Sequence, residues 1–285
     1  MKPLLNINTY LATAAANRNT LQRVLFGGIL LILAYNFYTK LFVSQLGLNP
    51  ILYQEIDPAY WLTMLLHIPQ LIAGNKVAAI CFDSLLVITA VVSFVKPQQA
   101  KSVVVFYVLY VLYYLLFNLI TGHHYAFIGV LVTTFPFIVT HKRKFAFLLA
   151  ASRYYFAFAF ASAAIWKIMR GNVFYKGQLQ GVLQAQNVYA SLQEQQTLIQ
   201  QLQLYIAGNT QLAVVLWVLM VLIELVFITA FFTYRYDGLL LIAYFLFAIG
   251  GYFFTSVFII DNVLLLLTLF PVLLFIQKHT KKATP

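Results

Sequence analysis

Lys167 and Arg153 are cations on a long apolar stretch, where an ionisable side chain needs a chemical or structural reason. Arg153 lies about eight residues inside the run 145–166, and Lys167 follows its end. At about 100° of rotation per residue, both fall within about 40° of each other on one helical face. The residues between them on that face are small or aromatic: Ala157, Phe160 and Ala164. We therefore expect Lys167 to face the protein interior, and Arg170 to be an interfacial anchor.

Three further polar residues lie where acid–base chemistry would need them. Asp83 lies inside another apolar run, and His123 and His124 form a predicted turn at the same outer level as Lys167. A lysine near a carboxylate or a histidine can have its pKa tuned for proton transfer. These residues are candidates to assist Lys167 catalytically (His123, Asp83) or to bind substrate (His124). The alternative is that they cap helices or lie at the interface.

Glu224 is predicted to form a structural ion pair with Arg153. Each lies about eight or nine residues from the same end of its apolar run, and buried membrane charges tend to pair. A polar substrate site is the alternative for this pair.

Aromatic residues add one more candidate site, and metal-ligand patterns add none. Tyr107, Tyr110 and Tyr114 are spaced to share one helical face, which favours either an aromatic substrate pocket or helix packing. The histidines and aspartates have no recognisable metal-ligand spacing, so no metal is expected. The single cysteine, Cys81, excludes an internal disulfide.

The elements that must hold these residues are membrane helices. The chain of 285 residues is 62% hydrophobic and only 9% charged, which indicates an all-α polytopic membrane protein surrounded by lipid. A bilayer needs about 20 apolar residues per crossing. About eight runs qualify: 21–43, 77–95, 102–120, 124–140, 145–166, 211–233, 237–256 and 262–277. Counts from seven to nine remain open because some runs are short or nearly continuous.

The basic residues orient the predicted helices. With eight spans, the basic links all fall on one side: Lys2, Arg18 and Arg23; Lys96 and Lys101; 141–144; Arg235; and the tail lysines. The positive-inside rule then places both termini in the cytoplasm of a multi-pass inner-membrane protein. The net charge of +11 is therefore not a nucleic-acid signature.

The expected organisation is one membrane domain with short extensions. A polar or interfacial lead-in covers 1–20, the transmembrane domain covers 21–277, and a basic cytoplasmic tail covers 278–285. The domain carries two outer segments, 44–76 and 167–210.

Two stretches carry a resemblance to a known family: GHHYAFIGVLVTTFPF from residue 122 and YYFAFAFASAAIWKIMRGN from residue 154. They resemble the core of the vitamin K-dependent γ-carboxylases and of the related horizontally transferred transmembrane (HTTM) domain proteins. The resemblance covers roughly residues 20 to 277. It implies that Lys167 is the active-site base and that His123 matches the family's motif histidine. The histidine of the carboxylases' penultimate span is absent here, where 245–247 are apolar.

Two functions follow as hypotheses. The first is an enzyme in which Lys167 takes a proton from a quinol-like or peptide substrate at the outer face, with a quinone-type cofactor left open. The second is a non-catalytic membrane subunit or a maturation or export factor. It would bind a secreted peptide, or a membrane or periplasmic protein, through the glutamine-rich segment 178–203. The lipid bilayer is a partner in both, and no nucleic acid is expected.

Overall fold

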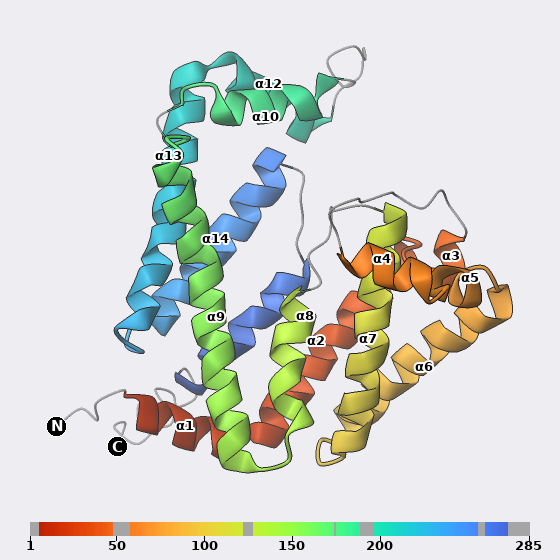
Figure 1. Ribbon diagram of the computed structural model, residues 1–285. Helices are drawn as coiled ribbons and strands as arrows, with labels where there is room; N and C mark the ends of the chain where they lie inside the picture. The colour runs from red at the N-terminus through yellow and green to blue at the C-terminus, as the bar shows by residue number, and fades with distance from the viewer. Residues whose placement is uncertain are drawn as a thin grey trace. The chain divides into compact units, whose positions relative to one another are not determined.

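The computed structural model describes residues 6–47, 58–121, 128–173, 175–188, 197–255 and 260–272. Across these ranges the chain is helical and contains no β-strand, as Figure 1 shows. The predicted all-α class is therefore confirmed for the part of the chain that the structure describes.

Five helical segments of the described chain are long and apolar enough to cross a membrane. They are Arg18–Leu46, Lys76–Val95, Ala100–Leu119, Lys142–Met169 and Thr210–Phe231. Shorter apolar helices cover Ile128–Ile138, Asp237–Phe253 and Asp261–Val272, which correspond to the three remaining runs. The chain is thus a helical protein suited to a lipid bilayer, while eight crossings and cytoplasmic termini stay predictions.

The chain divides into two compact units, each described here by itself. The α2 unit comprises Asn8–Ser152 and Ile259–Pro285, and the α13 unit comprises Met1–Ile7 and Arg153–Phe258. The division into a lead-in, one membrane domain and a tail stays a prediction, and the tail lies outside the described residues.

The α2 unit contains most of the helices. They are α1 (Ile7–Ala16), α2 (Arg18–Tyr38), α3 (Val43–Leu46), α4 (Pro58–Leu65), α5 (Ile68–Ile72), α6 (Lys76–Val95), α7 (Ala100–Thr121), α8 (Ile128–Thr134), the 3₁₀ helices η1 (Phe135–Ile138) and η3 (Ile260–Leu269), and the start of α9 (Lys142–Met169). Helix α6 packs against both α2 and α7, and α8 packs against η3. A Cβ at Gly129 of α8 would overlap the Asp261 carbonyl group of η3, so glycine permits this close approach.

A buried cation and a helix cap hold parts of the α2 unit together. The Arg18 guanidinium donates to the backbone carbonyls of Pro97 (3.4 Å), Phe137 (3.1 Å) and Val139 (3.2 Å). It thereby ties the first turn of α2 to two connecting loops. Asn75 begins α6 by accepting hydrogen bonds from two backbone N–H groups of its first turn.

The α13 unit contains the rest of α9 and the helices α10 (Gln178–Gln186), α12 (Leu198–Gly208), α13 (Thr210–Val226), η2 (Phe227–Phe231) and α14 (Asp237–Thr255). Thr197 and Gln200 form a reciprocal capping box that starts α12. Helices α10 and α12 lie side by side in Figure 1 and pack on α13. A small apolar core joins the three: Leu179, Leu183, Ile206, Ala207 and Ala213.

Candidate functional site

Lys167 forms a two-point ion pair with Glu224 in the α13 unit. Its Nζ donates to Glu224 Oε1 at 2.6 Å and to Oε2 at 2.8 Å. The Glu224 side chain is 3% exposed, whereas that of Lys167 is 24% exposed. The carboxylate is therefore withdrawn from solvent, while the ammonium group lies at the edge of the buried region.

An indole ring flanks the ion pair and is held by the chain that follows α9. The Lys167 Nζ lies 5.1 Å from the centre of the Trp217 ring, within the range of a cation–π contact. Trp217 Nε1 donates to the Asn172 carbonyl at 3.2 Å. Three buried apolar residues pack beside it: Ala164, Val173 and Val221. Lys167 is thus fixed by a carboxylate, a ring and an apolar wall.

The predicted interior face of α9 is confirmed by burial. Arg153, Ala157 and Ala164 are fully or almost fully buried, and Phe160 is 9% exposed. Arg170 lies off this face and is exposed, with its guanidinium 4.3 Å from the centre of the Trp166 ring. An exposed tryptophan beside an arginine is typical of a membrane-interface anchor.

The predicted pairing of Arg153 with Glu224 is wrong, because Arg153 pairs with Asp237. The Arg153 Nε donates to Asp237 Oδ2 at 3.0 Å, and its Nη2 pairs with Asp237 Oδ1. The same guanidinium donates to the carbonyls of Ala230 (2.9 Å) and Thr233 (3.0 Å). Its plane lies 4.1 Å from the Tyr234 ring centre. With both charges fully buried and most donors used, this pair is structural.

Equal depth along two apolar runs does not place two residues at the same level, because the helices end at different levels. The first turns of α13 pack against α10 and α12, and Trp217 of α13 contacts Asn172 beyond the end of α9. Helix α13 therefore extends past α9, and Glu224 meets the last turns of α9 at Lys167. Asp237 is the first residue of α14 and of the predicted run 237–256, and it was not among the buried charges expected from the sequence.

Tyr234 completes the surroundings of the Arg153–Asp237 pair. Its hydroxyl lies 2.9 Å from that of Tyr154. Burial raises the pKa of the Tyr234 hydroxyl, which therefore stays neutral at physiological pH.

Aromatic rings fill the space between the two ion pairs along α9. Phe160 stacks on Phe227 with ring centres 4.6 Å apart, and it contacts Tyr244 (5.8 Å) and Phe247 (5.1 Å) edge-on. Lys167 follows Arg153 by fourteen residues, or about 21 Å of helix. This aromatic layer (Phe160, Phe227, Tyr244 and Phe247) lies between the Lys167–Glu224 pair and the Arg153–Asp237 pair.

Asp83 lies in the α2 unit and binds backbone groups. Its Oδ1 accepts from the Val43 N–H at 3.2 Å and its Oδ2 from the Ser44 N–H at 2.8 Å, so it caps α3. It also lines a mostly apolar cavity of about 710 Å³ between α2 and α6, together with Ser44 and Ser84. The geometry indicates a structural carboxylate at the wall of a cavity, and its predicted catalytic role stays a prediction.

The remaining predicted site residues are placed as follows. Tyr110 is fully buried, with its ring centre 5.5 Å from that of Phe106, and the ring of Tyr107 lies 6.1 Å from that of Phe135. These are contacts of helix packing; Tyr114 is partly buried, and a substrate role for the three tyrosines stays a prediction. His123 and His124 lie outside the described residues.

The Lys167–Glu224 pair has the elements of a proton-transfer site. Both carboxylate oxygens lie within hydrogen-bonding distance of Nζ, which is the geometry that proton transfer between the two groups requires. The partial exposure of Lys167 leaves it open to a ligand, whereas the buried Glu224 can act only through Lys167.

Comparison with known proteins leaves the resemblance as a prediction. No protein-family model matches the chain, and no curated protein and no solved structure is similar to it at a significant level.

Proposed function

We propose that the protein is a multi-pass inner-membrane enzyme of the HTTM type in which the Lys167–Glu224 pair is the acid–base centre. One observation carries the proposal: a partly exposed ammonium group donates to both oxygens of a buried carboxylate. Burying the Glu224 carboxylate costs free energy, which its pairing with Lys167 offsets. Because Lys167 is partly exposed, a ligand at the membrane surface can reach the pair.

The proposed chemistry is removal of a proton from a substrate that arrives from the outer leaflet. Lys167 passes a proton to Glu224, and its neutral amine then accepts a proton from an acidic O–H or C–H bond. A quinol-like molecule and a secreted peptide are the two substrate classes. The Trp217 ring offers a flat apolar surface beside the reacting nitrogen.

Untargeted mass spectrometry of molecules that copurify with the protein tests this proposal. The informative variant is Lys167→Met/Glu224→Leu, which replaces the ion pair with apolar side chains of similar size and is expected to fold. The matched control is Lys176→Gln, which removes an exposed lysine of the same unit. Wild type and control should carry an enriched quinol-like molecule or peptide whose amount or chemical form changes in the paired variant. The same molecules in all three samples would reject the proposal.

An exposed apolar stripe on α12 favours a second candidate function, the binding of a partner protein. Leu198, Leu202 and Tyr205 recur at helical spacing and are 83%, 44% and 65% exposed. The opposite face of α12 is already packed on α10. The stripe therefore has the pattern of an anchor for a peptide or periplasmic protein, as in helix-in-groove recognition.

Photo-crosslinking from residue 202 distinguishes the two candidates. A subunit or maturation factor should give one specific protein adduct, and that adduct should persist in Lys167→Met/Glu224→Leu. Adducts with lipid alone would mean that the stripe rests on the membrane surface.

A further inference from the structure

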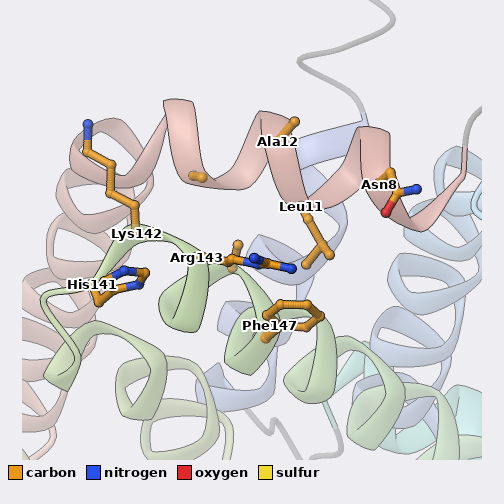
Figure 2. A pocket seen from close by; sticks show the side chains of 9 residues that line it. Asn8, Leu11, Ala12, His141, Lys142, Arg143 and Phe147 are labelled. Carbon is orange, nitrogen blue, oxygen red and sulfur yellow. The ribbon is translucent and has the colours of Figure 1, made fainter.

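A cavity of about 580 Å³ lies between α1 and the start of α9 in the α2 unit. Figure 2 shows α1 passing across the first turns of α9, with Arg143 and Phe147 beneath it. Helix α1 contributes Asn8 and Leu11, and α9 contributes the two basic side chains Lys142 and Arg143. This volume lies within the range of small-ligand pockets, about 300–1,000 Å³.

The cavity carries positive charge that no carboxylate balances. Its lining contains His141, Lys142 and Arg143 and no acidic residue. The sequence has no aspartate or glutamate in 1–54 or in 84–193. Among the described residues, neither Lys142 nor Arg143 forms an ion pair, and Arg143 lies 5.8 Å from the Phe147 ring centre. The basic side chains are therefore available to an anion.

Apart from Asn8, the remaining lining is apolar, so the cavity suits an amphipathic ligand. Five residues provide that surface: Leu11, Ala12, Ala15, Ala146 and Phe147. Phe147 is 45% exposed, which gives the ligand an accessible aromatic contact. A ligand with an anionic group and an adjoining hydrocarbon part would satisfy both kinds of surface.

The cavity lies where two candidate membrane spans begin. One span starts at Arg18, two residues after α1 ends, and another starts at Lys142 itself. In the predicted topology, residues at the start of these spans lie beside the lipid headgroups, whose anionic phosphates attract cationic side chains. The amino-terminal end of α9 adds backbone N–H groups and a partial positive charge that also favour an anion.

Helix α1, which forms one wall of the cavity, is tied to η3 by a hydrogen bond. The Tyr10 hydroxyl donates to the Thr268 carbonyl of η3 at 2.7 Å, and this bond is buried. Fixing a wall of the cavity in this way reduces the ordering cost of binding.

We propose that the cavity between α1 and α9 binds the phosphate headgroup of an anionic phospholipid. Arg143, which lies between α1 and α9, contacts the phosphate, and Lys142, whose side chain extends away from Arg143 in Figure 2, adds positive charge at the edge of the cavity. The Asn8 amide donates to the headgroup, and Leu11 and Phe147 contact the first part of the acyl chains. The site is independent of Lys167 and its chemistry.

Native mass spectrometry of the full chain tests the site with two lipid probes, phosphatidylglycerol and phosphatidylcholine. The test variant is Lys142→Gln/Arg143→Gln. The control, Lys96→Gln/Lys101→Gln, removes two exposed lysines from the same unit, and both variants are checked for unchanged melting temperature. Each cation near anionic headgroups contributes about 1 kcal/mol, so the test variant should bind phosphatidylglycerol about 30-fold more weakly. The control should weaken binding much less than the test variant, because the proposal places the bound headgroup in the cavity and both control lysines lie outside it.

Three results would overturn the proposal. Equal losses in the two variants would mean that the overall charge attracts lipid without a site. Equal binding of the two probe lipids to wild type would exclude selection of an anionic headgroup. Complete displacement of phosphatidylglycerol by millimolar inorganic phosphate would identify a site for a soluble anion.

Discussion

Lys167 and Glu224 should be strongly coupled in their contribution to stability, and replacing either residue alone should destabilise the protein by a different amount. Lys167→Met removes two short hydrogen bonds between charged groups, each worth about 1.5–3 kcal/mol net, and leaves a 3% exposed carboxylate without its partner. We expect it to lower the free energy of unfolding by about 3 kcal/mol, the lower end of the range for a broken buried pair.

The reverse single variant should cost less. Glu224→Leu leaves an ammonium group that is already 24% exposed and can extend toward water, so the expected loss is about 1 kcal/mol. The double variant Lys167→Met/Glu224→Leu should unfold within about 1 kcal/mol of wild type, because an apolar pair removes both desolvation penalties. The coupling energy, the sum of the two single losses minus the loss in the double variant, is then about 4 kcal/mol.

Reversible unfolding in detergent micelles, followed by circular dichroism, measures all four forms. Arg170→Met is the control cation from the next turn; it loses only an exposed contact with Trp166 and should cost about 0.5–1 kcal/mol. Additive losses in the double variant, or a larger loss from Glu224→Leu than from Lys167→Met, would refute the reasoning.

Three further variants test other contacts by the same unfolding measurement. Arg153→Lys keeps the charge but loses the planar donor fork, so it should cost about 2 kcal/mol; an unchanged stability would contradict a structural pair. Gly129→Ala should cost about 1–3 kcal/mol because the methyl group meets the Asp261 carbonyl, whereas Gly181→Ala, with nothing within 4 Å, should be neutral or stabilising by up to about 1 kcal/mol. Equal effects at the two glycines would contradict this close approach. Asp83→Asn leaves one backbone N–H of α3 without its acceptor and should cost about 1–3 kcal/mol, and no loss would show that the cap is unimportant.

Local patterns in the sequence predicted local structure well. The rotation of about 100° per residue in an α-helix was enough to place Arg153 and Lys167 on one face, and the burial of Ala157 and Ala164 confirms that face. Composition and apolar run length likewise predicted the helical class because burial and backbone hydrogen bonding restrict what an apolar chain can form.

Pairing between helices could not be predicted in the same way. The predicted pairing of Glu224 with Arg153 rested on their similar distance from the ends of their apolar runs. The relative level of the two residues also depends on how far α13 extends past α9, and the sequence of each run alone does not contain that offset. Asp237 had a usable signal, since it is one of only seven acidic residues and follows Arg235 at the start of an apolar run. A buried arginine needs a carboxylate, and testing every acidic residue against Arg153 would have included it.

The chemical form of the bound ligand tests the central claim most directly. Mass spectrometry would compare the molecule that copurifies with wild type and with the folded Lys167→Met/Glu224→Leu variant, after equal incubation in membranes. If the pair is the acid–base centre, the variant should hold the ligand unreacted while wild type holds the product or has released it. The same chemical form at the same occupancy in both proteins would contradict a catalytic role for Lys167 and Glu224.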